Sequence, residues 1–78
     1  MGDSYLAINF KVSPISGIDI LIAELSYLSF EMFEENSRGV TAYIKKSAYK
    51  DGILNNVRIL NSNEFKISYK IQEIQNKN

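Results

Sequence analysis

The chain has 78 residues, of which 45% are hydrophobic and 23% charged, a composition that fits one small globular domain and excludes a disordered chain. It contains no cysteine and no histidine, which excludes disulfides, thiolate nucleophiles, histidine bases and the commonest zinc sites. The formal net charge is zero, which argues against a basic nucleic-acid binder. No apolar run approaches the roughly 20 residues that span a bilayer. No secretory signal is visible, so we expect a cytoplasmic protein.

The charges are unevenly distributed along the chain. Residues 1–36 contain one basic and six acidic side chains, whereas residues 37–78 contain eight basic and three acidic ones. In a fold whose strands interleave the two halves, these charges largely neutralise one another. We therefore expect no functional dipole.

The first half of the chain predicts a strand followed by an amphipathic helix. Apolar and polar residues alternate over residues 5–12, as in a half-buried strand, and Pro14 ends it. A helix is predicted for residues 17–29, with Ser16 as its N-cap. Its apolar stripe has helical spacing and consists of Ile18, Leu21, Ile22, Leu25 and Leu28.

The second half predicts three strands and a weaker helix. Strands at 30–35 and 40–45 flank the turn residues 36–39 and form a hairpin. A second helix is expected after its cap, Ser47, although Gly52 weakens it; one face would carry Tyr49, Ile53, Leu54 and Val57. The last strand is predicted for residues 65–71, and residues 72–78 turn polar.

The resulting order is β-α-β-β-α-β, which predicts an α+β fold of the ferredoxin-like type. In this sandwich both helices cover one face of a four-stranded antiparallel sheet, whose first and third strands are central. We expect the domain to span residues 1–74 and residues 75–78 to begin an interdomain linker or a tail.

The other face of the sheet is open, and we place the binding site there. If Met32 pairs with Ile44, then Phe33 faces Tyr43 and Glu31 faces Lys45, which is favourable across an outer face. The predicted substrate-binding residues are Tyr5, Asn9, Phe33, Tyr43 and Ser68, surrounded by Glu31, Glu35, Lys45 and Lys70. The alternative is an ordinary solvated face with scattered aromatics, or one covered by another domain.

The chain offers no catalytic constellation. Glu31, Glu34 and Glu35 resemble an acidic cluster, but strand alternation sends Glu34 to the opposite face from the other two. No glycine-rich phosphate loop is present, and Ser16 and Ser47 lack a base that would activate them. We expect no catalytic, cofactor-binding or metal-binding residue, and thus no enzyme activity from this chain by itself.

Packing and turn patterns recur in Leu6–Phe10 through Pro14, Ile20–Leu25, Phe30–Glu35, Gly39–Ile44 and Tyr69–Asn76. These segments resemble the N-terminal domain of the PrmA family, the methyltransferases that modify a ribosomal large-subunit protein. The resemblance is closest to Bacteroidetes-type members and covers residues 4–76.

The resemblance implies a ferredoxin-like substrate-recognition domain that binds the ribosomal protein. In the family, a separate C-terminal domain of the same chain uses S-adenosylmethionine to methylate lysine and N-terminal amino groups. This chain lacks the tryptophan-bearing linker and the glycine-rich cofactor loop that follow in the family. The chain is then either an excised domain or a stand-alone relative, and we favour the excised domain. We expect that it needs no cofactor itself and contacts neither nucleic acid nor membrane.

Two other functions fit the expected fold. One is an ACT-like module that dimerises and binds a small regulatory ligand between helices. The other is an RRM-like RNA-binding sheet, on which Tyr5, Phe33 and Tyr43 would stack on bases. The neutral charge and the missing RRM signature weigh against RNA.

Overall fold

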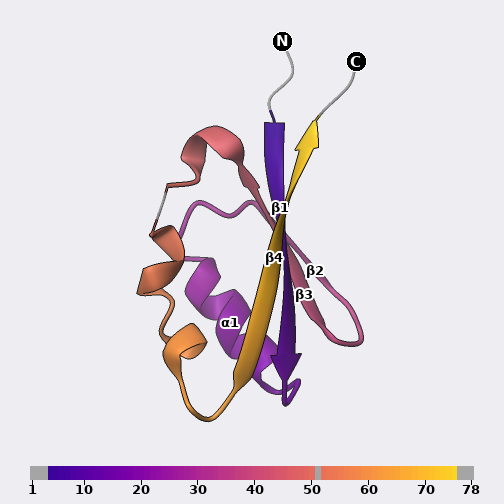
Figure 1. Cartoon of the computed structure of the whole chain (residues 1–78), viewed down its shortest axis with the longest axis vertical. Coiled ribbons are helices and arrows are strands. Elements are labelled where there is room, and N and C mark those ends of the chain that lie inside the picture. The colour runs from indigo at the N-terminus through magenta and orange to yellow at the C-terminus, as the bar shows by residue number, and fades with distance from the viewer. Residues whose placement is uncertain (1–3, 51, 76–78) are drawn as a thin grey trace.

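The computed structural model describes residues 4–50 and 52–75, which form one sheet covered on one side. In Figure 1, helix α1 and the helical turns between residues 46 and 61 lie on the same side of the strands. The elements in chain order are β1 (Ser4–Ser13), α1 (Gly17–Leu25), β2 (Met32–Glu35), β3 (Gly39–Lys45), η1 (Lys46–Ala48), η2 (Ile53–Asn56), η3 (Arg58–Asn61) and β4 (Lys66–Gln75).

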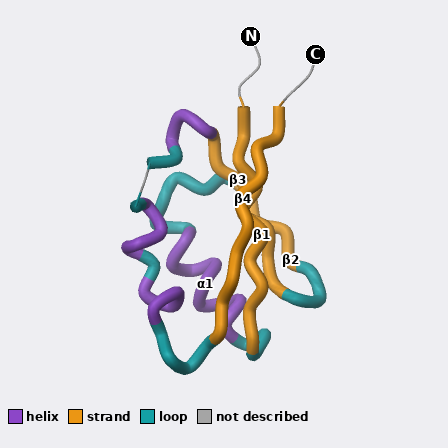
Figure 2. Tube along the Cα trace, viewed as in Figure 1, coloured by secondary structure: helices purple, strands orange, loops and turns teal. Residues whose placement is uncertain are grey.

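The four strands are antiparallel and lie in the order β2-β3-β1-β4. The first and third strands are central, as the sequence predicted. β1 and β4 are the longest strands, and they pair along their full length from Ser4–Gln75 to Ser13–Lys66. Figure 2 shows this long pair running the height of the molecule. The fold is thus α+β, with a four-stranded antiparallel sheet and one α-helix among the described residues.

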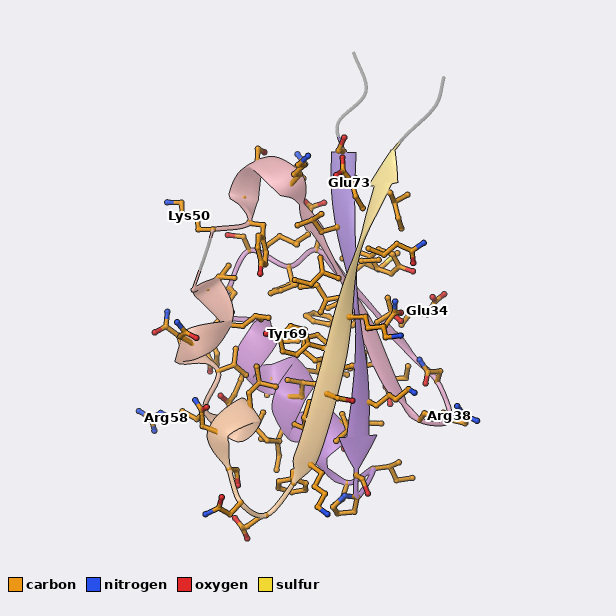
Figure 3. All side chains as sticks on the ribbon, viewed as in Figure 1. Glu34, Arg38, Lys50, Arg58, Tyr69 and Glu73 are labelled. Atoms are coloured by element: carbon orange, nitrogen blue, oxygen red, sulfur yellow. The ribbon has the colours of Figure 1, made fainter. Side chains whose placement is uncertain are left out.

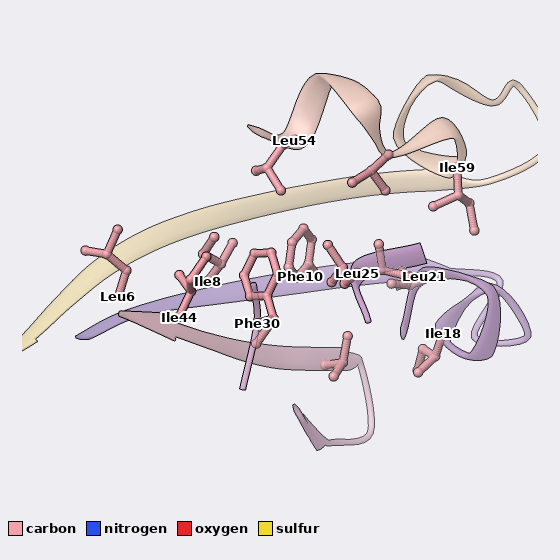
Figure 4. Close-up of a cluster of buried hydrophobic side chains, with 14 residues drawn as sticks. Leu6, Ile8, Phe10, Ile18, Leu21, Leu25, Phe30, Ile44, Leu54 and Ile59 are labelled. Carbon is pink, nitrogen blue, oxygen red and sulfur yellow. The ribbon is translucent and has the colours of Figure 1, made fainter. Parts of the chain in front are cut away.

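The core lies between the sheet and the covering segments (Figure 4). The alternation predicted for β1 is confirmed, because Leu6, Ile8, Phe10 and Val12 are all buried. The helical stripe is confirmed as well. Its buried members are Ile18, Leu21 and Leu25, and its partly buried members are Ile22 and Leu28.

The prediction of a second α-helix is wrong. Residues 46–61 instead contain the three short 3₁₀ turns, of which η2 begins after Gly52, whose φ of 84° is left-handed. A left-handed residue cannot continue an α-helix, so the backbone restarts there. The apolar residues of this segment still reach the core, where Leu54, Val57 and Ile59 are buried.

Several predicted boundaries also change. α1 ends at Leu25 rather than at residue 29. Ser16 is its N-cap but makes no side-chain capping hydrogen bond, and Ser47 lies inside η1, whose N-cap is Lys45. β4 continues to Gln75, four residues beyond the predicted strand, because these residues pair with the first half of β1. Of the expected linker, residues 76–78 lie outside the described residues.

The predicted pairing of β2 with β3 is wrong by one residue. Met32 pairs with Tyr43 and Phe33 with Ala42, whereas the prediction paired Phe33 with Tyr43. Paired residues share a face, so Phe33 lies on the covered side with buried Ala42. There its ring centroid is 6.3 Å from that of Phe30. The apolar surface that Phe33 buries against Phe30 and the core favours this register.

Candidate functional site

The open face of the sheet consists of four rows of side chains that run across the strands. The first row contains Tyr5 with Lys45 and Ile74, and the second contains Ala7 with Tyr43, Gln72 and Met32. The third row contains Asn9, Thr41, Lys70 and Glu34, and the fourth contains Lys11, Gly39 and Ser68. In Figure 3, Glu34 and Arg38 lie on this side, away from α1.

Four of the five predicted binding residues share this face, namely Tyr5, Asn9, Tyr43 and Ser68. Phe33 does not belong to it, because it packs against the core on the other side. Glu35 is misplaced for the same reason, since it pairs with the buried Val40. The register thus separates the three aromatic side chains that the sequence placed together.

One end of the open face is apolar and aromatic. Tyr5 and Tyr43 are partly buried there, while Met32 is 54% exposed and Ile74 is 41% exposed. The two phenols are held by carboxylates: Tyr5 donates to Glu31 over 3.3 Å, and Tyr43 donates to Glu34 over 3.2 Å. We call Tyr5, Met32, Tyr43 and Ile74 the aromatic patch.

The surroundings of Tyr43 favour its protonated form. Burial raises the pKa of the Tyr43 phenol above 10.0, and the negative charge of Glu34 and the hydrogen bond to it act in the same direction. The hydroxyl therefore stays a hydrogen-bond donor at neutral pH, and its side chain is fixed against β2.

Polar contacts hold the middle and the margin of the face. The Thr41 hydroxyl donates to Asn9 Oδ1 over 2.6 Å between the two central strands. At the margin, Lys45 Nζ lies 4.0 Å from a Glu31 carboxylate oxygen, and both side chains are nearly half exposed. The predicted Glu31–Lys45 pair is therefore present. Glu31 precedes β2 and reaches the pair from outside the strand.

The other end of the face is basic. A hollow of about 460 Å³ is lined by Lys11, Val12, Ser13, Arg38, Lys66, Ile67 and Ser68. A smaller hollow of about 180 Å³ adjoins it through Lys11 and Ser68, and adds Asn9, Tyr69 and Lys70. No acidic residue is among those that line the two hollows. We call Lys11, Arg38, Lys66 and Lys70, with Ser13 and Ser68 between them, the basic groove.

The sequence contained a signal for this groove. The alternation of β4 places Lys66, Ser68 and Lys70 on one face, and that of β1 places Lys11 outward. What brings them together is the β1–β4 pairing, which sets Lys11 opposite Ser68. The predicted strand order already places β4 beside β1, but the register that sets Lys11 opposite Ser68 cannot be read from local periodicity.

Among the described residues, no group of three or more acidic side chains lies close enough together to hold a metal ion. No helix in the same part of the chain is long and apolar enough to cross a membrane. The open face thus presents aromatic and apolar surface at one end, and cations and hydroxyls at the other.

Comparisons with protein-family models, curated proteins and solved structures found no match.

Proposed function

We propose that this chain is a protein-recognition domain that binds its partner through the open face of the sheet. The observation that carries this proposal is the asymmetry of the two faces. One face is covered by α1 and the 3₁₀ turns, while the other groups the aromatic patch beside the basic groove. A partner that fits would present an apolar anchor followed by acidic or hydroxyl side chains.

The sequence resemblance supports a specific partner. On it we propose that the chain serves as the recognition domain of a cytoplasmic PrmA-type methyltransferase. It would hold the ribosomal large-subunit protein for a separate domain that uses S-adenosylmethionine. The fold would then be a ferredoxin-like sandwich in which η1, η2 and η3 take the place of the second helix. The central position of β1 and β3 supports this arrangement.

The test is binding of the chain to that ribosomal protein, measured by biolayer interferometry with matched surface variants. Met32→Ala removes an exposed anchor from the aromatic patch and should weaken binding about fivefold to tenfold. The control, Tyr27→Ala, removes a residue that is 90% exposed and lies outside the open face. It should leave binding unchanged.

The possible outcomes separate the two parts of the proposal. No binding of the ribosomal protein would refute the PrmA-type assignment. Binding that Met32→Ala and Tyr27→Ala weaken equally would refute the open face as its site.

RNA binding is a second candidate function, and the basic groove favours it. The zero net charge hides a local excess of cations, since Lys11, Lys66 and Lys70 make no ion pair among the described residues. Tyr5 and Tyr43 lie on the same face, where aromatic side chains stack on bases in RNA-binding sheets.

Fluorescence anisotropy with a single-stranded oligouridylate distinguishes this candidate from protein recognition. If the groove binds RNA, affinity falls with salt, and replacing the three lysines with glutamine lowers the logarithmic salt slope by about 2. The protein-recognition proposal expects no salt-dependent binding of this probe.

A further inference from the structure

The two edges of the sheet are protected very differently. β2 forms one edge and has only four residues, of which Glu34 and Glu35 are charged. β4 forms the other edge and has ten residues, whose backbone pairs on one side only, with β1. Natural proteins keep edge strands short, charged or covered, because an open edge pairs with other strands. Within the described part of the chain, β4 is neither short nor covered, and Lys66, Lys70 and Glu73 are its only charged residues.

An apolar strip runs along the open edge on the covered side of the sheet. Ile67, Tyr69 and Ile71 pair with Val12, Phe10 and Ile8 of β1, so they share the face of the core. Tyr69 is nevertheless 45% exposed and Ile71 44% exposed, although the Tyr69 ring lies 5.6 Å from that of Phe10. Figure 3 shows Tyr69 beside β4, on the side of α1. The core therefore continues to the edge and stops there without a neighbour.

We propose that β4 pairs antiparallel with β4 of a second copy of this chain, about a two-fold axis at Tyr69, to form a continuous eight-stranded sheet. The axis would be perpendicular to the sheet. Paired residues must share a face, so only registers in which the two residue numbers have an even sum are allowed.

The side chains of β4 select one of these registers. With the axis at Tyr69, the two Tyr69 rings meet, and Ile67 lies opposite Ile71 of the second copy. On the other face, Ser68 lies opposite Lys70, and Lys66 lies opposite Gln72. All seven residues from 66 to 72 then pair, with apolar groups facing apolar groups and no like charges opposed.

The neighbouring registers are worse. An axis at Lys70 sets the two Lys70 ammonium groups opposite each other and Ile67 opposite Glu73. An axis at Ser68 opposes Lys66 to Lys70. An axis at Ile71 sets Tyr69 against Glu73. Because the chain carries no net charge, no overall repulsion opposes association of two copies.

The contact is small and its affinity should be modest. A junction through one strand per copy falls at the low end of interface sizes, below about 1,200 Å². We therefore expect a dissociation constant between about 10 µM and about 1 mM. Sedimentation velocity over this range should show a concentration-dependent shift from monomer to dimer.

Disulfide trapping tests the register, because the native chain has no cysteine. Ser68→Cys and Lys70→Cys are both at exposed positions of β4. In the proposed register, residue 68 of one copy faces residue 70 of the other. The same residue in the two copies is offset diagonally, by about 7–8 Å between Cα atoms, which is too far for a relaxed disulfide. In a glutathione buffer, mixing the two variants should give a crosslinked heterodimer in several-fold excess over either homodimer.

Two results would overturn the proposal. One is a monomer at all concentrations up to about 1 mM. The other is a mixed crosslink no more abundant than the homodimers, which would mean a different register or random collision. Far-UV circular dichroism of both variants checks that they fold. A charge test is independent of cysteine: Ser68→Lys should weaken the dimer, and adding Lys70→Glu should restore it by pairing opposite charges across the junction.

Discussion

Replacing Phe33 with alanine tests the observed register of β2 directly. Phe33 lies on the covered side, packs against the core and contacts the ring of Phe30. Truncating a fully buried phenylalanine costs about 3–5 kcal/mol, and Phe33 is only partly buried, so we expect a loss of about 2 kcal/mol. A domain of this size has a total stability of about 4–12 kcal/mol, so the variant should fold but be clearly weakened.

The neighbouring residue provides the matched control. Met32 lies on the open face and is 54% exposed, so Met32→Ala should change the free energy of unfolding by less than about 0.5 kcal/mol. Urea denaturation followed by far-UV circular dichroism measures both variants. With a slope of about 1–1.5 kcal/mol per molar urea, Phe33→Ala should lower the midpoint by about 1.5 M.

The predicted pairing of Phe33 with Tyr43 makes the opposite forecast. In that register Phe33 is an outer-face residue and Met32 belongs to the core, so Met32→Ala would be the destabilising change. A midpoint shift for Met32→Ala that equals or exceeds that for Phe33→Ala would refute the placement of Phe33 in the core.

Three further predictions concern other parts of the fold. Gly39→Ala should destabilise the fold by about 3 kcal/mol in the same denaturation assay, because a Cβ would overlap the Phe10 carbonyl oxygen in the adjacent strand. A loss of stability below about 1 kcal/mol would contradict this close approach. Glu24→Gln should lower the stability by about 1–2 kcal/mol. The carboxylate accepts hydrogen bonds from the backbone N–H groups of Arg58 and Ile59 at the start of η3, whereas an amide offers only one oxygen. Glu35→Gln is the control and should leave the stability nearly unchanged. The Tyr43 phenol should titrate above pH 10.0 in an ultraviolet difference titration, and Glu34→Gln should bring the pKa down towards 10.0. Folding raises the pKa of Tyr43, so the protonated phenol contributes stability that is present below pH 10.0. This contribution is lost as the pH rises through the pKa of the folded state. On going to alkaline pH, Tyr43→Phe should therefore lose less stability than the native chain.

The sequence predicted the parts of the fold whose periodicity extends over many residues. The β1 alternation and the α1 stripe each repeat at least four times, so only one face of each element can be buried. β2 has four residues with an apolar side chain on each face, so its alternation could not choose between Met32 and Phe33. A tertiary contact, the packing of Phe33 against Phe30, decides which face of β2 is buried.

The second helix failed because of a single backbone conformation. Helix propensity predicts only a small penalty for Gly52, whereas in the structure it adopts φ of 84° and interrupts any α-helix there. The role of Glu24 was also out of reach, because its partners are backbone N–H groups 34 and 35 residues away. The predicted placement on the open face was correct where long strands carry the residues, at Tyr5, Asn9, Tyr43 and Ser68. The predicted placement was wrong at Phe33, which a short strand carries.

The pairing of Ser4 with Gln75 has a mechanical consequence. The first and last described strands leave the sheet side by side at one end of the molecule, as Figure 1 shows. A force that pulls these two ends apart acts across the ladder and loads its hydrogen bonds one pair at a time, beginning with the outermost. Stretched in this way, β4 should separate from β1 by successive rupture of single hydrogen-bonded pairs. The force needed should be much lower than for a sheet that is pulled in shear along its strands.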